Sequence, residues 1–176
     1  MKKSFILLPG LLVAIFFIFS GIDRSEYVVE KKMWKIQQHF AGLTRYAGII
    51  SPEEAENVAA LYKKLTHQYP KSSLLPQIYM QIGNVYAVKN DFDKARVNYS
   101  EVLQRVAQQH DLCSVALLGI GLTYEKEKNH DQAIATFKQI VKDYPLTDVG
   151  LSMPIYIAKY YHQFNENAQT KMAFIE

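Results

Sequence analysis

The sequence predicts an all-α protein, in which an α-solenoid of about three helical hairpins follows an N-terminal transmembrane helix. Three observations predict it: an internal repeat with an offset of 38 residues, apolar residues at helical spacing, and an uncharged stretch over residues 4–22. An offset of this size is typical of stacked helical units. We expect three parts: residues 1–22 as a signal-anchor, residues 23–70 as an amphipathic helix with a degenerate first hairpin, and residues 71–176 as repeats.

Residues 4–22 carry no charge and follow Lys2 and Lys3. As a helix they would extend about 28 Å, close to the roughly 30 Å hydrocarbon core of a bilayer. The lysines place the amino end in the cytoplasm. We therefore expect a single-pass membrane protein whose remaining part is exported, and the resemblance described below implies a bacterial cytoplasmic membrane with that part facing the periplasm or exterior. A cleaved secretory signal is the alternative and has the same consequence for export. Ile22 stands where a lipoprotein would need cysteine, which excludes a lipid anchor.

Residues 25–46 predict a long amphipathic helix. Its apolar residues step by three and four along one stripe: Val29, Met33, Ile36, Phe40, Leu43 and Ala47. Such a stripe either packs on the first repeat or forms a seam for self-association or a partner helix. Trp34 lies off the stripe. Its side chain could take part in ordinary packing, or it could contact lipid headgroups or a partner.

A second helix is predicted to begin after Ser51. Pro52 suits its first position, and Glu54 completes a capping box with Ser51. Pro70 ends this helix. With the preceding helix it would form the degenerate first hairpin.

The internal repeat becomes visible when Gly83 is aligned with Gly121. Seven positions then agree in character between the two copies: Tyr79, Ile82, Gly83, Tyr86, Ala95, Tyr99 and Val102 in the first, and Leu117, Ile120, Gly121, Tyr124, Ala133, Phe137 and Ile140 in the second. Their spacing of three and four residues places each half of a copy on one face of a helix. Each copy therefore predicts two helices in succession.

Gly83 and Gly121 fall in the middle of predicted helices, where glycine costs about 1 kcal/mol relative to alanine. We interpret this repeated cost as a sign of close helix packing, with each glycine against Ala95 or Ala133. Between the helices of each pair, the polar dipeptides 90–91 and 128–129 interrupt the apolar pattern. Their second residues, an aspartate and an asparagine, are predicted to cap the following helices.

This pattern resembles the tetratricopeptide repeat, over roughly residues 51–174. The second copy, residues 114–145, closes with the usual proline, whereas the first, residues 76–107, ends in Ala107. The offset exceeds the family's usual 34 residues by four, so we expect a longer second helix in the first copy or a looser connection over residues 108–111. The joins at Tyr69-Pro70 and Tyr144-Pro145 resemble those of bacterial envelope members. Among these are the Tol-associated cell-division coordinator, the lipoprotein of the outer-membrane β-barrel assembly machine and the ancillary subunit of the Sec translocon.

The resemblance implies a concave groove lined by the first helix of each hairpin, and non-enzymatic binding of a protein or peptide partner of the cell envelope. The residues projected onto this groove are Gln77, Met80, Asn84, Val88, Leu118, Leu122, Lys126, Ile155 and Lys159. Met80 and Leu118 stand where a clamp for a peptide carboxylate would need a basic residue. The groove is therefore predicted to be an apolar trough for an extended or helical segment. The amphipathic helix could already cover part of it.

The end of the chain predicts the first helix of a third copy, with Ile157, Ala158 and Tyr161 on its apolar face. Thr170 and Phe174 fit the start of a further helix. Because residues 173–175 are apolar, this end could pair with another chain. Self-assembly through residues 25–46 or the C-terminal end is therefore the alternative function, as a homo-oligomeric structural protein.

Catalysis, metal binding, cofactors and nucleic acid are not expected. His110-Asp111 and His130-Asp131 resemble phosphohydrolase dyads, but acidic residues are common where helices begin. The remaining histidines lack metal-ligand spacing. Residues 23–176 contain 18 basic and 17 acidic residues, a balance that offers no basic patch for nucleic acid. The single cysteine, Cys113, excludes an intrachain disulfide and is expected to be a small buried residue.

Overall fold

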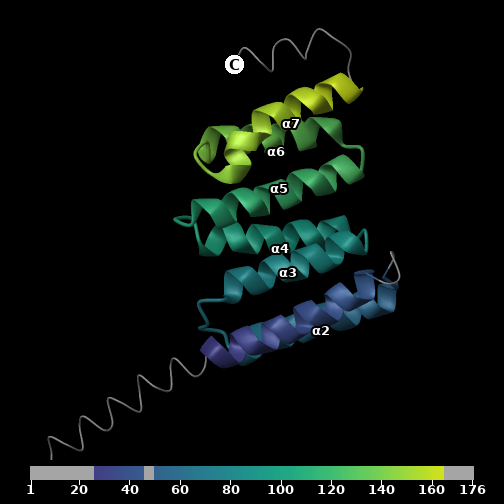
Figure 1. Cartoon of the computed structure of the whole chain (residues 1–176), viewed down its shortest axis with the longest axis vertical. Helices are drawn as coiled ribbons and strands as arrows, with labels where there is room; N and C mark the ends of the chain where they lie inside the picture. Colours follow the sequence, from purple (N-terminus) through teal and green to yellow (C-terminus); the bar gives the residue numbers. More distant parts are fainter. Residues whose placement is uncertain (1–25, 46–49, 165–176) are drawn as a thin grey trace, which may run out of the picture.

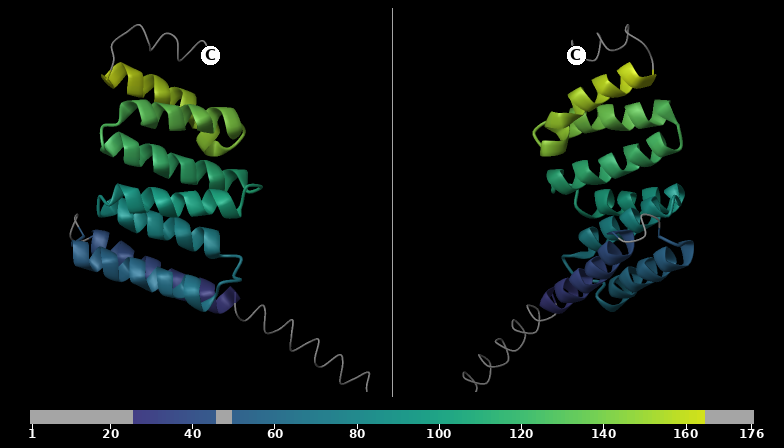
Figure 2. Two further views of the ribbon diagram at one scale, coloured as in Figure 1. Left: turned by 180° about the vertical axis from the view of Figure 1, so that it is seen from behind. Right: turned by 45° about the vertical axis from the view of Figure 1, so that its right-hand side comes forward.

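The computed structural model describes residues 26–45 and 50–164 of the chain. All regular elements within these ranges are α-helices, stacked one on the next (Figure 1). The amphipathic helix covers residues 26–45, and it is followed by α2 (Pro52–Gln68), α3 (Leu75–Val88), α4 (Phe92–Arg105), α5 (His110–Lys126), α6 (His130–Asp143) and α7 (Asp148–Phe164). The amphipathic helix and α2 lie side by side at one end of the stack, and α7 lies at the other (Figure 2). The all-α fold of stacked hairpins is confirmed.

The helix starts follow from local hydrogen bonding. The Ser51 side chain accepts a hydrogen bond from the Glu54 backbone N–H at 3.2 Å, and the Glu54 carboxylate accepts one from the Ser51 N–H at 3.2 Å, which completes the capping box. Asp91 caps α4 through the N–H of Lys94, and Asn129 caps α6 through the N–H of Gln132. The predicted caps are therefore confirmed.

The turns inside the two central hairpins have the same backbone conformation. Asn90 and Lys128, the residues before the caps, have φ angles of 63° and 62°. These positive values reverse the chain so that Asp91 N–H donates to the Tyr86 carbonyl and Asn129 N–H to the Tyr124 carbonyl, both at 2.9 Å. The repeat seen in the sequence thus extends to the backbone of the turns.

Each repeat glycine packs against an aromatic ring of the paired helix. A Cβ added to Gly83 would lie 2.5 Å from the Tyr99 ring, and one added to Gly121 would overlap the Phe137 ring. The predicted close packing is confirmed, and the nearest atoms belong to the Tyr99 and Phe137 rings rather than to Ala95 and Ala133. Each glycine therefore leaves space for a flat ring from the next helix.

The extra residues of the 38-residue offset lie in α5. Helices α4 and α6 both contain 14 residues, so the expectation of a longer second helix in the first copy is wrong. The connections after them, residues 106–109 and 144–147, are equal in length, so the first is not looser. Helix α5 instead has 17 residues where α3 has 14. The additional residues lie in the N-terminal part of α5, before the repeat glycine Gly121.

The core forms two clusters of buried residues. One extends from the amphipathic helix through α2, α3 and α4 to Ala116 of α5, and the other joins α5, α6 and α7. Val29 and Ile36 are buried in the first cluster, and Met33, Phe40 and Leu43 pack against it. The amphipathic stripe therefore packs on the first hairpins, and this face is not available as a seam for another chain.

Two polar contacts tie the amphipathic helix to the join between α2 and α3. The Glu26 carboxylate accepts a hydrogen bond from the Ser72 hydroxyl at 2.7 Å, and Lys32 Nζ donates to the Tyr69 hydroxyl at 2.9 Å. Ile157 and Ala158 are buried in α7, as expected for the first helix of a third copy.

Residues 4–22, the predicted anchor, lie outside the described residues, as do Thr170 and Phe174 of the expected last helix. None of the described helices combines the length and apolar character needed to cross a bilayer.

Candidate functional site

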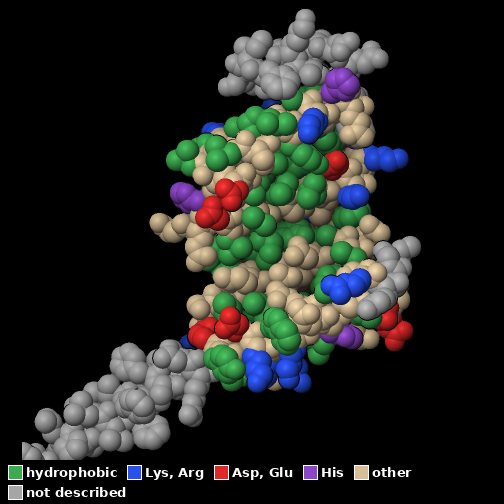
Figure 3. Space-filling model, viewed as in Figure 1, with side chains coloured by type: hydrophobic (Ala, Val, Ile, Leu, Met, Phe, Trp, Pro, Cys, Tyr) green, Lys and Arg blue, Asp and Glu red, His purple; other side chains and the backbone are tan. Residues whose placement is uncertain are grey.

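A hollow of about 380 Å³ lies between α3 and α5, above a side chain of α4. It is lined by Ala87, Val88, Asn90, Phe92, Tyr99, Gly119, Leu122, Thr123 and Lys126. Hydrophobic side chains also gather on the face of the stack drawn in Figure 3, over the helices between α3 and α7. The hollow is part of the predicted groove, because Val88, Leu122 and Lys126 line it together.

The Tyr99 ring forms the floor of this hollow. It lies between two glycines, because an added Cβ would come within 2.5 Å of the ring at Gly83 and within 2.8 Å at Gly119. The Tyr99 hydroxyl donates a hydrogen bond to Asn84 Oδ1 at 2.9 Å. Burial raises the pKa of Tyr99 to about 12, so the hydroxyl remains a donor at neutral pH. The floor is thus fixed by packing on both sides and by one polar contact.

The walls of the hollow expose apolar surface to solvent. Val88 is 45% exposed at the end of α3, and Leu122 is 38% exposed on α5. Lys126, one turn further along α5, places a positive charge at the rim. Neighbouring apolar walls with one cation offer van der Waals contact to a partner side chain and attraction to an acidic group beside it.

These features belong to a known architecture. The sequence model described as tetratricopeptide repeat matches residues 74–145, which correspond to α3–α6 and their joins. Over this range the chain is similar to tetratricopeptide repeats. The comparison with curated proteins gave no match. Tetratricopeptide repeats generally mediate protein–protein interactions.

Four of the residues projected onto the groove are less exposed to solvent than Val88 and Leu122, which form the walls of the hollow. Met80 is only 6% exposed and belongs to the first core cluster. Leu118 is partly buried and packs against the second cluster. Asn84 is half-buried and holds Tyr99, and the half-buried Gln77 has its Oε1 buried without a hydrogen-bond partner. These residues build the groove's base rather than its accessible surface.

The third helical unit presents a different surface. Ile155 of α7 is 56% exposed, and Lys159, one turn later, is exposed. Beneath them, the Tyr156 ring meets the Phe137 ring edge-on at 5.1 Å between centroids, and its hydroxyl donates to Glu125 at 2.6 Å. Burial is the main cause that raises the pKa of Tyr156. Here the predicted residues are exposed beside a tyrosine ring that packs on Phe137.

Sequence reasoning missed Gly119, Thr123 and Phe92 as lining residues. Gly119 escaped because its equivalent in the first copy, 38 residues earlier, is Gln81, so the position does not repeat. The signal that could have found it is the pair of glycines two residues apart, at 119 and 121. On α5 they point toward rings from two different helices, Tyr99 and Phe137.

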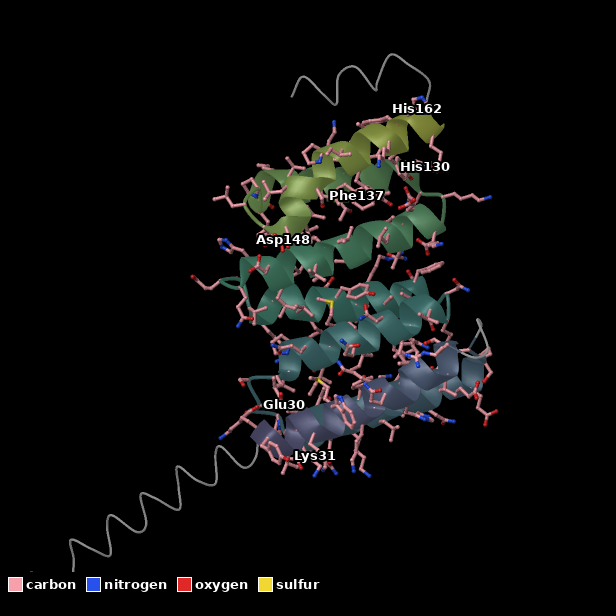
Figure 4. The ribbon with its side chains drawn as sticks, in the orientation of Figure 1. Glu30, Lys31, His130, Phe137, Asp148 and His162 are labelled. Atoms are coloured by element: carbon pink, nitrogen blue, oxygen red, sulfur yellow. The ribbon has the colours of Figure 1, made fainter. Side chains whose placement is uncertain are left out.

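The residues considered for chemistry have structural contacts. His110 packs edge-on against the Tyr144 ring with centroids 5.6 Å apart, and His130 Nδ1 lies 2.5 Å from the Tyr160 hydroxyl. Cys113 is buried, and its thiol contacts the Val106 carbonyl at 3.2 Å. In the described ranges, no group of three His, Cys, Asp or Glu side chains could hold a metal ion. Asp148 and His162 lie at opposite ends of α7 (Figure 4).

Proposed function

We propose that this protein is a non-enzymatic scaffold or chaperone-like adaptor that binds a segment of a partner protein in the groove. The observation that carries the proposal is the hollow between α3 and α5, with its exposed apolar walls and a floor held rigid by two glycines. A preformed apolar recess can accept one large side chain of an extended or helical segment without reorganisation.

We also propose that the adaptor works in the bacterial cell envelope. The uncharged residues 4–22 and the preceding lysines support a single-pass anchor in the cytoplasmic membrane, with the repeats facing the periplasm or exterior. The partner would then be a protein or peptide of that compartment. The similarity in topology to the ancillary subunit of the Sec translocon supports this location.

The groove is tested by capture of partners in cells of origin. Val88→Glu and Leu122→Glu place charges on the walls of the hollow, where both side chains are already exposed and folding should be retained. Leu118→Glu is less suitable because Leu118 packs against the core. The matched control is Val97→Glu, since Val97 is 64% exposed on α4 and does not line the hollow.

We expect photo-crosslinking followed by mass spectrometry to identify envelope proteins with the wild type and with Val97→Glu, but not with the double variant. Circular dichroism should show equal helicity and melting for all three. The same captured proteins with the folded double variant would contradict the groove.

Self-assembly is the second candidate, and the exposed apolar residues near the last described helix favour it. Leu146 is 89% exposed in the α6–α7 join, and Leu151 and Ile155 are 64% and 56% exposed on α7. Light scattering of the detergent-solubilised full chain separates the candidates. A dimer that dissociates in Leu151→Glu would support assembly through this end, and a strict monomer would remove it.

A further inference from the structure

The amphipathic helix has an outer face that the core does not use. Opposite the buried stripe, a second set of residues recurs at steps of three, four and seven: Tyr27, Lys31, Trp34, Gln38 and Arg45, all of them exposed. The exposed fractions of the two aromatic side chains are large, 62% for Tyr27 and 57% for Trp34. We call these five residues the outer face. Figure 4 shows Lys31 at the end of the stack remote from α7.

The chemistry of the outer face combines aromatic rings with cations. Lys31 Nζ lies 6.0 Å from the Tyr27 ring centroid, and the exposed Lys35 flanks the same side. Glu30 is the exposed acidic residue on the helix, because the other one, Glu26, is bound to Ser72 and Ser73. Lys32 is likewise turned to Tyr69. The charges left to solvent are therefore mainly positive.

A bilayer surface is the partner that this combination fits. Tryptophan and tyrosine side chains prefer the headgroup region, where the ring is shielded and its polar atom stays hydrated. Lysine and arginine near the surface are attracted to anionic lipids within about one Debye length, roughly 10 Å at 0.1 M salt. Tryptophan, tyrosine and arginine are also common in protein interfaces, but lysine is depleted there, so the exposed Lys31 and Lys35 beside the rings favour a lipid surface.

The chain length also brings the outer face to the membrane. Tyr27 follows Ile22 by five positions, and a fully extended chain of five steps spans at most about 18 Å. If residues 4–22 span the bilayer, the first turn of the amphipathic helix cannot lie far from the headgroups. The hollow between α3 and α5 involves other helices, so a bilayer on the outer face would leave it accessible.

We propose that the outer face binds the surface of an anionic bilayer, with Tyr27 and Trp34 at the headgroup level and Lys31, Lys35 and Arg45 near lipid phosphates. The proposal rests on the membrane tether of the proposed function. The stack of helices would then have one fixed orientation relative to the membrane surface.

Trp34 provides a direct readout because it is the only tryptophan of the chain. The full-length protein is reconstituted into vesicles of phosphatidylcholine, with or without phosphatidylglycerol, and with brominated acyl chains as quenchers. Flotation reports the tether, and Trp34 emission reports the outer face. The test variant is Lys31→Gln with Lys35→Gln and Arg45→Gln. The matched control is Lys138→Gln with Lys142→Gln, two exposed lysines of α6.

In vesicles containing phosphatidylglycerol, we expect blue-shifted Trp34 emission and about a twofold loss of intensity to the brominated lipid, as for a ring at the interface. The loss should be smaller in pure phosphatidylcholine, in high salt and in the triple variant, and unchanged in the α6 control. Protein that floats with vesicles while Trp34 remains unquenched would overturn the proposal and leave the tether standing. Protein that does not float would overturn both. Blue-shifted but unquenched emission would mean that protein covers this face, and would also overturn the proposal.

Discussion

The two central repeats each place an aromatic ring against the equivalent glycine, but they differ on the other side of that ring. In the first, Tyr99 lies between Gly83 and Gly119, and a hollow opens above it. In the second, Phe137 lies against Gly121, and the ring of Tyr156 packs on it from α7. One ring is the floor of a recess and the other is buried beneath a second ring.

This difference shows that the residues that repeat build the fold, while those that do not repeat decide where a hollow stays open. Gly119 and Thr123 of α5 correspond to Tyr156 and Tyr160 of α7, when Gly121 is aligned with Ala158. Two small residues therefore leave space where two tyrosines fill it. The hydroxyl of Tyr99 has Asn84 as its acceptor, whereas the position equivalent to Asn84 in the second repeat is Leu122, which needs no donor.

The largest expected loss of stability comes from placing a side chain at Gly121, in the space that the Phe137 ring occupies. Gly121→Leu cannot be accommodated beside Phe137 without moving α5 and α6 apart, and it should reduce the free energy of unfolding by about 3 kcal/mol or more. Gly83→Leu should act similarly against Tyr99. Urea denaturation followed by circular dichroism measures both. The control is Gly42→Ala, whose Cβ would meet no atom within 4 Å. Unchanged urea midpoints for both leucine variants would contradict the close packing of rings against these glycines.

Removing the ring that covers Phe137 should make the second repeat resemble the first. Tyr156→Ala removes an edge-on aromatic contact and the hydrogen bond to Glu125, which together should cost about 2 kcal/mol. Tyr156→Phe keeps the ring and should lose about 1 kcal/mol. Equal losses from the two variants, measured by urea denaturation, would mean that the ring contributes nothing.

A smaller loss of stability is expected from removing the hydroxyl by which Tyr99 differs from Phe137. Tyr99→Phe leaves Asn84 Oδ1 without its donor and should cost about 1 kcal/mol. Asn84→Leu in the same chain gives positions 84 and 99 the residues found at the equivalent positions 122 and 137, and it should recover part of that loss. A double-mutant cycle measures the coupling between the two side chains. Strictly additive losses would show that the hydrogen bond does not couple them.

The smallest effect concerns the equivalent tyrosines Tyr86 and Tyr124. The Tyr86 hydroxyl donates to Glu56 at 3.0 Å, whereas Arg96 lies over the Tyr124 ring at 4.5 Å. The hydrogen bond from Lys89 is the main cause that lowers the pKa of Glu56 below 4.5. The stability that this carboxylate contributes is therefore present above about pH 4.5 and lost as the pH falls through the lowered pKa.

In Glu56→Gln the free energy of unfolding should fall less between neutral and acidic pH than in the wild type. The difference should be a few tenths of a kcal/mol, because the carboxylate is partly exposed. Thermal melts across this pH range test it, with Glu53→Gln, at an exposed position of α2, as the control. A wild-type pH dependence in Glu56→Gln would contradict the assignment.

Much of the fold could be predicted because its signals are local. The capping residues Ser51, Asp91 and Asn129 act within three positions of themselves, and the apolar stripes report the buried face of each helix. The predicted groove was less complete. Met80 was projected onto the surface by its position in the repeat, yet neighbouring helices bury it, and Gly119 was missed because it has no counterpart in the first copy.

The sequence by itself determined that the chain is a stack of helical hairpins, where its helices begin, and that a glycine in each repeat marks close packing. Only the tertiary structure decided that an aromatic ring packs against each repeat glycine, that the amphipathic helix turns its stripe inward, and that a hollow opens beside Tyr99 whereas Tyr156 packs on Phe137. The physical reason is that caps and helical periodicity depend on neighbours along the chain. An open or filled space depends on the volumes of side chains that three successive helices bring to the same point.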